Sequence, residues 1–174
     1  KNRFPQSLYR KALGEERYRL FCRLKGKMDA VLGDLVCFEK ENWYQGDGRF
    51  RLIEHHALHT KNFGYVEYII YKDQLQAAIH FDKAYFENLP AIIDELSPKF
   101  RNILFHMPKC LEKAPCGAQC KELCKGCRTA VFDARLYPEE VMHICHHTNI
   151  VADISDEEDI ESMGLLYRHI LDYM

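Results

Sequence analysis

The sequence predicts one α+β domain, residues 1–174, because helical patterns occupy both ends of the chain and strand patterns lie between them. Apolar residues recur at helical spacing in residues 5–41 and again in the last twenty residues. The middle is rich in β-branched and aromatic residues. The chain has 174 residues, of which 47% are hydrophobic, and it is therefore large and apolar enough to bury a core. This composition excludes an intrinsically disordered protein.

Residues 5–41 are predicted to form one or two helices with a basic, solvated face. Glycine inside a helix costs about 1 kcal/mol relative to alanine, so we expect a break near Gly26 or Gly33. Cys22 and Cys37 lie within the amphipathic pattern and are interpreted as core residues.

A small antiparallel sheet is predicted next, after a loop at residues 42–48. Its three strands are expected at residues 49–55, 65–71 and 75–81. A helix capped by Asp82 should pack on this sheet through one apolar face, and a second short helix or turn should begin after Pro98. The apolar face comprises Tyr85, Phe86, Leu89, Ile92, Ile93 and Leu96.

The last third is predicted to contain a cysteine-rich knuckle, a β-hairpin and a terminal helix. Residues 129–137 and 141–147 fit a hairpin around a polar turn, although Pro138 could instead begin a helix. Ser155 is the expected N-cap of the terminal helix, with Glu158 three residues later. An alternative division places a helical and sheet part in residues 1–108 and a cysteine-rich, metal-binding part in residues 109–174.

Five of the eight cysteines lie between Cys110 and Cys127, and this cluster predicts a structural zinc site. A gap of two residues that includes a glycine lets Cys124 and Cys127 turn towards one ion. A hairpin that starts after Cys127 would bring Cys145 back beside them. The predicted ligands are Cys120, Cys124, Cys127 and Cys145, with Cys116 and His146 as substitutes.

The segment from Cys120 to Cys127 has the CxxxCxxC form and resembles the cluster motif of the radical SAM enzymes over eight residues. The resemblance implies an iron–sulfur cluster. In that family the motif is followed by many βα units of a large barrel, whereas 47 residues follow Cys127 and contain no cofactor-binding glycine motif. We therefore keep an iron–sulfur cluster, with Cys116 as a further ligand, as a less favoured alternative to zinc. A third interpretation is that the thiols are simply buried or form disulfides.

Other patterns give weaker predictions of chemistry. His55 and His59 have the spacing of zinc-protease ligands, but the position after the first histidine holds His56 instead of the general-base glutamate. Both faces of residues 65–71 are rather apolar, so one face could contact a ligand or a second copy of the chain.

Residues 1–27 carry nine basic and two acidic side chains, while the whole chain has a formal net charge of −2. Such asymmetry can mark nucleic-acid binding, but no nucleic-acid-recognition motif is present. An amphipathic helix explains the pattern better, so a nucleic-acid partner is not expected.

These observations lead to an expectation about function. We expect a cytoplasmic, non-catalytic binding module in which zinc supports the fold and the sheet face binds a small ligand, a protein partner or a second copy. The charged N-terminal residues and the lack of a long apolar run predict no membrane association. The first alternative is a metal- or thiol-dependent enzyme that uses Cys116–Cys127. The second is a nucleic-acid-associated regulator that uses the basic N-terminal helix.

Overall fold

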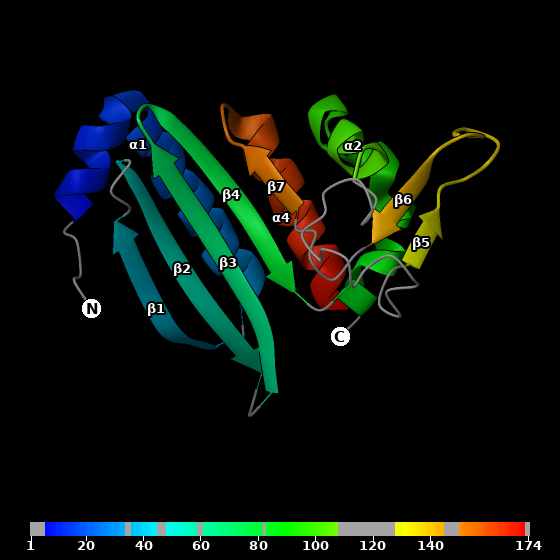
Figure 1. Ribbon diagram of the computed structural model, residues 1–174, viewed down its shortest axis with the longest axis horizontal. Coiled ribbons are helices and arrows are strands. Elements are labelled where there is room, and N and C mark those ends of the chain that lie inside the picture. Colours follow the sequence, from blue (N-terminus) through cyan, green and yellow to red (C-terminus); the bar gives the residue numbers. More distant parts are fainter. Residues whose placement is uncertain are drawn as a thin grey trace, which may run out of the picture.

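The computed structural model describes residues 6–33, 36–44, 48–58, 61–81, 83–107, 128–144 and 150–172. Its centre is an antiparallel sheet of five strands in the order β1-β2-β3-β4-β7 (Figure 1). The strands are β1 (Val36–Tyr44), β2 (Arg49–Leu58), β3 (Lys61–Tyr71), β4 (Gln74–Phe81) and β7 (Ile150–Asp153). The predicted combination of helices with an antiparallel sheet is confirmed.

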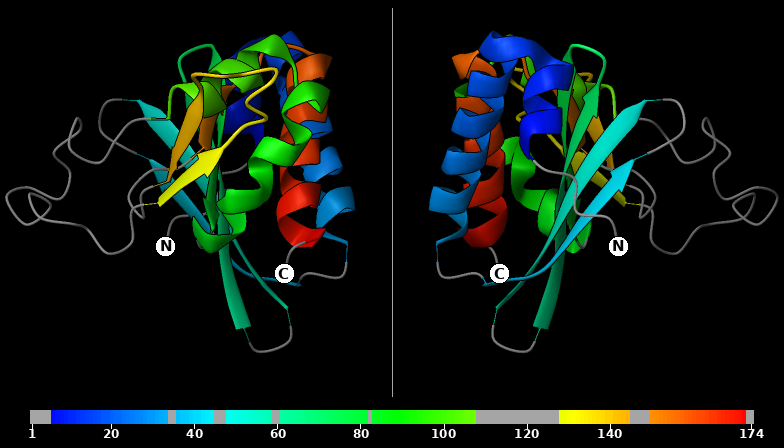
Figure 2. Two further views of the ribbon diagram at one scale, coloured as in Figure 1. Left: turned by 90° about the vertical axis from the view of Figure 1, so that its right-hand side faces the viewer. Right: turned by 90° about the vertical axis from the view of Figure 1, so that its left-hand side faces the viewer.

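Two long helices cover one face of this sheet. α1 (Gln6–Leu32) and α4 (Glu157–Asp172) lie side by side on the same side of the strands, as both views in Figure 2 show. Beyond β7 lie the 3₁₀ helix η1 (Lys83–Glu95), the helix α2 (Pro98–Phe105) and a hairpin of β5 (Arg128–Val131) and β6 (Val141–Ile144). No described helix is long and apolar enough to cross a membrane.

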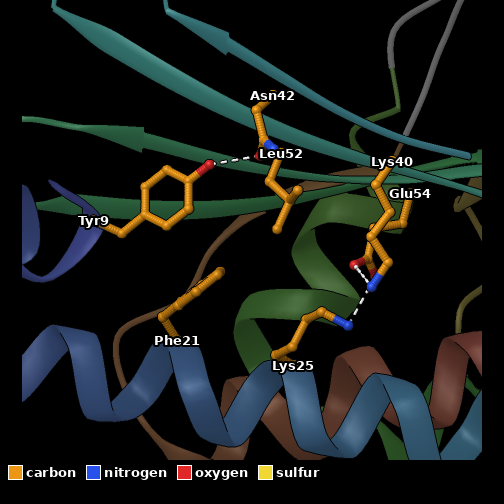
Figure 3. Close-up of a pocket in the computed structure, with 7 residues that line it drawn as sticks. All are labelled: Tyr9, Phe21, Lys25, Lys40, Asn42, Leu52 and Glu54. Atoms are coloured by element: carbon orange, nitrogen blue, oxygen red, sulfur yellow. Dashed lines mark hydrogen bonds and ion pairs between the residues drawn. The ribbon is translucent and has the colours of Figure 1, made fainter. Parts of the chain in front are cut away.

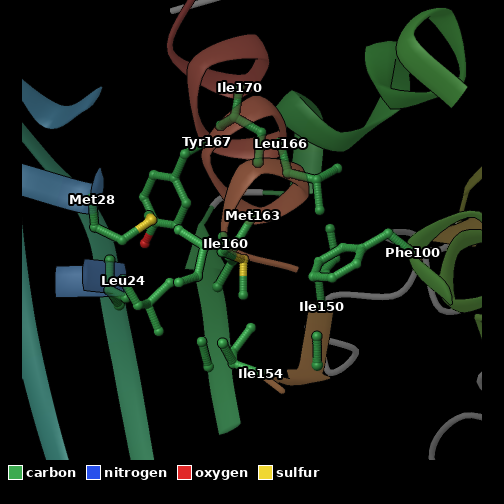
Figure 4. Packing of buried hydrophobic residues seen from close by; sticks show 14 of the residues in the cluster. Leu24, Met28, Phe100, Ile150, Ile154, Ile160, Met163, Leu166, Tyr167 and Ile170 are labelled. Carbon is green, nitrogen blue, oxygen red and sulfur yellow. The ribbon is translucent and has the colours of Figure 1, made fainter. Parts of the chain in front are cut away.

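The core forms between the sheet and these helices because their sequence periods place apolar residues on the facing surfaces. On β3, Val66, Tyr68 and Ile70 are buried at every second position. Residues of α1, α4, α2 and β7 complete the core shown in Figure 4. Its labelled side chains are Leu24, Met28, Phe100, Ile150, Ile154, Ile160, Met163, Leu166, Tyr167 and Ile170.

Opposite charges also connect α1 with α4. Arg23 lies 2.7 Å from a carboxylate oxygen of Glu157, and Lys27 lies 2.5 Å from one of Glu161. Gly164 lets the helices approach closely, since a Cβ atom there would lie 2.7 Å from the Lys27 side chain. The basic residues predicted to form a solvated face therefore lie partly against acidic residues of the same chain.

The beginning of the sheet differs from the prediction. Residues 5–41 were expected to be helical, but α1 ends at Leu32, and Gly33 follows with a left-handed φ of 44°. The chain then enters β1, which pairs with β2 along its length. The predicted break at Gly33 is correct. The helix predicted beyond it, up to residue 41, is wrong because pairing with β2 outweighs the local helical pattern.

Both cysteines interpreted as core residues need correction. Cys22 is exposed, and Cys37 is only half-buried within β1. Phe21, Leu24 and Met28 define the buried face of α1, and position 22 is rotated by about 100° from position 21. Cys22 therefore points away from the core.

The predicted meander is confirmed as β2, β3 and β4, and the hairpin around Pro138 is present as β5 and β6. Its first strand ends at Val131 instead of Tyr137. β7 has four residues and was not predicted; it pairs with β4. The helix expected after residue 82 is a 3₁₀ helix with Pro90 inside it, and proline lacks the N–H that an α-helical bond would need. Asp82 lies outside the described residues.

The N-cap of α4 is Asp156 and not Ser155. The backbone N–H of Asp159 donates to Oδ1 of Asp156 at 2.9 Å, which is the bond expected from a capping side chain. Ser155 donates to Asp159 Oδ2 from its backbone nitrogen at 2.8 Å and from its hydroxyl at 2.9 Å. The capping pattern is therefore shifted by one residue.

Gly14 bends α1 near its beginning. Its φ of 73° and ψ of 168° lie in a region that essentially only glycine occupies. The bend separates the turns that carry Tyr9 and Leu13 from the long segment that carries Leu24 and Met28, and all four side chains are buried.

We predict that Gly14→Ala lowers the free energy of unfolding by about 1–3 kcal/mol, because alanine is strained in this conformation. Gly26→Ala is the matched control, since Gly26 lies within the same helix, has no positive φ and has open space around the added Cβ. It should raise the stability by about 0.5–1 kcal/mol. Urea unfolding followed by circular dichroism measures both values. Equal effects of the two substitutions would contradict the role of Gly14.

Candidate functional site

A cavity of about 190 Å³ lies between α1 and strands β1 and β2 (Figure 3). One side is formed by α1, and the other by the helix-facing side chains of the two strands. Seven residues line it: Tyr9, Phe21, Lys25, Lys40, Asn42, Leu52 and Glu54. Apolar side chains and charged groups therefore meet in one space that is partly open to solvent, and small-molecule sites usually combine such groups.

Glu54 is the most unusual member of this set. Alternate residues of β2 face α1, which places Glu54 between Leu52 and His56 on the buried side of the strand. Its side chain is 1% exposed. Burying a carboxylate is costly unless opposite charges accompany it, so the groups around Glu54 determine whether this arrangement is stable.

Two lysines supply those charges from different elements. Lys25 Nζ of α1 lies 2.9 Å from Glu54 Oε2, and Lys40 Nζ of β1 lies 3.0 Å from Oε1 (Figure 3). Neither carboxylate oxygen accepts a well-oriented hydrogen bond from the described residues. The two ion pairs therefore account for the stabilisation of the buried charge.

Lys25 is held in its cationic form. Burial lowers the pKa of Lys25, but Asp29 and Glu54 raise it more, so the net direction is upward. Asp29 lies on the next turn of α1, and its Oδ1 accepts from Lys25 Nζ at 2.6 Å. Lys25 thus bridges a solvent-facing carboxylate and a buried one.

The opposite wall of the cavity is largely aromatic. The rings of Tyr9 and Phe21 meet edge to face, with centroids 5.9 Å apart and an interplanar angle of 60°. The Tyr9 hydroxyl donates to Asn42 Oδ1 at 2.7 Å, which connects the first turns of α1 to β1. Burial raises the pKa of Tyr9, so this hydroxyl keeps its proton at neutral pH.

His56 and Tyr68 add uncharged polar groups to the same interior. His56 is 2% exposed, and neither ring nitrogen has a hydrogen-bond partner within the described part of the chain. Burial lowers the pKa of His56 and raises that of Tyr68 well above its usual range. Both side chains are therefore neutral at pH 7, and neither lines the cavity.

The other face of the sheet carries a separate network around Glu67. This carboxylate is 2% exposed, pairs with Arg51, and has Oε2 3.1 Å from His80 Nε2. Burial raises the pKa of Glu67, but the hydrogen bonds and positive charges of His80 and Arg51 lower it to about 2. Tyr65 stacks on His80, with ring centroids 4.2 Å apart. Tyr65 and Glu67, which belong to the strand expected to contact a ligand, therefore take part in a polar network on this face.

The metal ligands predicted from the sequence cannot be placed in this site. The favoured ligands and both substitutes, Cys116 and His146, lie outside the described residues. Within the described ranges no group of three or more histidine, cysteine or acidic side chains is arranged to hold a metal ion. His55 lies in β2 with Nε2 3.1 Å from Glu41 Oε1, and His59, which shares only the spacing of zinc-protease ligands with it, lies outside the described residues.

The cavity itself was not predicted. A glutamate within an apolar strand pattern was the one available signal, because alternation places Glu54 on the same face as Leu52. Pairing of that glutamate with Lys25 depends on how α1 packs against the sheet, which the local sequence does not reveal.

Comparison with known proteins adds no assignment: no family model, curated protein or solved structure matches this chain.

We predict that Lys25→Met lowers the free energy of unfolding by about 3–5 kcal/mol, because it leaves a buried carboxylate without its least exposed partner. Lys40→Met should cost less, since the Lys40 side chain is 55% exposed. The measurement is urea unfolding at pH 7.

Substituting both partners of the buried pair tests the mechanism. Lys25→Met combined with Glu54→Met should recover most of the loss, because no uncompensated charge remains. Absence of recovery in the double variant would show that Lys25 contributes through packing and not through its charge.

Proposed function

We propose that the chain is a non-catalytic binding module whose small ligand occupies the cavity between α1 and the sheet. The observation that carries the proposal is the composition of the cavity: aromatic and aliphatic side chains on one side, and a buried carboxylate with two ammonium groups on the other. Small-molecule sites combine apolar walls with a few polar groups that fix orientation. The cavity lies on the helix-covered face of the sheet.

Part of the basic helix is better explained by packing within the chain than by a nucleic-acid partner. Arg23 and Lys27 face carboxylates of α4, and Arg10 lies 2.7 Å from a carboxylate oxygen of Glu15. Cations that are already paired release fewer phosphate counterions, so they would contribute less to nucleic-acid affinity. This distribution favours the ligand-binding proposal.

We predict that compounds of about six to ten non-hydrogen atoms bind in the cavity and shift the amide resonances of its lining residues. The test is a screen of neutral, anionic and cationic fragments by heteronuclear NMR. Leu52→Trp should abolish these shifts by filling the cavity, since Leu52 is a lining residue and 9% exposed.

Leu136→Trp is the matched control, because Leu136 is 61% exposed and does not line this cavity. It should bind fragments as the original chain does, and circular dichroism should show both variants to be folded. Unchanged binding in Leu52→Trp, or no fragment that perturbs the lining residues, would overturn the proposed site.

We also propose that zinc, bound by Cys120, Cys124, Cys127 and Cys145, supports the hairpin next to this module. The support is the cysteine spacing together with the hairpin register. Arg128 pairs with Ile144 at the open end of the hairpin, and these residues directly follow Cys127 and directly precede Cys145 in the sequence. Two predicted ligands thus flank paired positions of an observed hairpin.

We predict one zinc ion per chain in protein purified without chelators, measured by elemental analysis. Cys124→Ser and Cys127→Ser should each lose the metal, and removal of zinc should lower the melting temperature because bound metal stabilises the folded state. Cys22→Ser is the control and should retain zinc, since Cys22 is an exposed residue of α1. Iron in place of zinc would favour the cluster alternative. Absence of both metals with all eight thiols titratable would overturn the site.

A further inference from the structure

We infer that the cavity selects a small organic anion, a carboxylate on a compact aromatic or aliphatic body, and that Lys40 receives the carboxylate. The inference rests on the proposed binding function and names the class of ligand. It follows from four properties of the site: the placement of its charges, its hydrogen-bonding capacity, the exposure of Lys40, and the size of the cavity.

The first property is charge. Lys25, Lys40 and Glu54 are the charged side chains that line the cavity. Asp29 does not line it but pairs with Lys25, so the four groups together carry no net charge. Both oxygens of Glu54 are buried and lie against the two ammonium groups. A ligand entering the cavity therefore meets the ammonium groups and not the carboxylate. The nearest charges are thus positive, which favours the head group of an anion over that of a cation.

The second property is the excess of hydrogen-bond donors. An ammonium group has three N–H donors and no acceptor. Lys25 uses at most two of them, on Asp29 and Glu54, and Lys40 uses at most one, on Glu54, among the described residues. The side-chain oxygen of Asn42 accepts from Tyr9, so the Asn42 amide contributes further donors. Such a site needs a ligand rich in acceptors, and a carboxylate has two acceptor oxygens without a competing donor.

The third property separates the two lysines. The Lys25 side chain is 21% exposed and that of Lys40 is 55% exposed. Lys40 can therefore turn towards a ligand at the mouth of the cavity while Lys25 stays beside Glu54. The buried carboxylate keeps one ion pair throughout, so binding does not leave an uncompensated charge in the core.

The fourth property is size. A volume of about 190 Å³ is slightly larger than that of an engineered apolar cavity of about 150 Å³ that binds benzene. Phe21 and Leu52 offer an apolar surface, and the Tyr9 ring meets Phe21 edge to face. A single ring or a short branched chain fits these dimensions and can pack against the aromatic wall. Benzoate is a suitable probe because it combines one ring with one carboxylate.

The experiment compares benzoate with benzamide and benzylamine, which keep the ring and replace the carboxylate with a neutral amide and with a cationic ammonium group. Heteronuclear NMR titration gives the dissociation constant and localises each compound through the amide shifts of Phe21, Leu52 and Glu54. Benzoate should bind at least tenfold more tightly than either analogue. Lys40→Met should lower benzoate affinity about tenfold and leave the affinity for benzamide nearly unchanged.

Lys11→Met is the matched control, because Lys11 is an exposed lysine of α1 outside the cavity. It should not change the affinity for benzoate.

Equal or tighter binding of benzamide or benzylamine would overturn the anion selectivity while the binding site itself stands. Unchanged benzoate affinity in Lys40→Met would overturn the role of Lys40. Failure of all three probes to shift the lining residues would overturn this ligand class, and the broader fragment screen with Leu52→Trp then decides whether the cavity binds any ligand.

Discussion

Glu54 places a carboxylate in the layer between α1 and the sheet, where a charge is stable only with opposite charges beside it. Lys40 comes from the neighbouring strand, but Lys25 comes from α1, so the ion pair requires α1 to cross the sheet at this point. Apolar packing alone would tolerate small shifts of the helix, whereas a buried ion pair at 2.9 Å does not. The ion pair thus places polar groups between α1 and the sheet, and the cavity lies beside them.

Charge complementarity extends this constraint along α1. The basic residues of the helix face carboxylates in three directions: Glu54 in the sheet, Asp29 on the helix itself, and Glu157 on α4. Exposed pairs such as Arg23 with Glu157 each contribute little stability. These ion pairs instead fix the orientation of α1, since a rotation of the helix about its axis would break them all at once. The strong charge asymmetry of the sequence is thus partly explained by the packing of one helix.

Elements defined by local patterns were predictable from the sequence, and elements defined by distant partners were not. The strands β2, β3 and β4 follow from segments rich in β-branched and aromatic residues, and the helix from Glu157 follows from an apolar stripe. β1 carries a pattern that also fits a helix, and β7 is only four residues long, so both become strands through pairing with β2 and β4.

The candidate site also depends on partners that are distant in the sequence. Glu54 and Lys25 are separated by β1 in the chain, and nothing in the local sequence of either residue predicts their contact. The predicted zinc ligands fall outside the described residues and stay a prediction.

The bend at Gly14 links the backbone of α1 to the chemistry of the cavity. Phe21 and Lys25 follow the bend and reach the cavity from the long part of the helix, whereas Tyr9 precedes it. A straight helix would carry Tyr9 along the axis of the long segment, and its hydroxyl could then not be expected to reach Asn42 of β1. The aromatic wall and the Tyr9–Asn42 hydrogen bond therefore depend on a backbone conformation that glycine supplies. The buried ion pair fixes the long segment over the sheet, and the bend brings the first turns of the helix back against it. The cavity is therefore lined by residues from both sides of the bend.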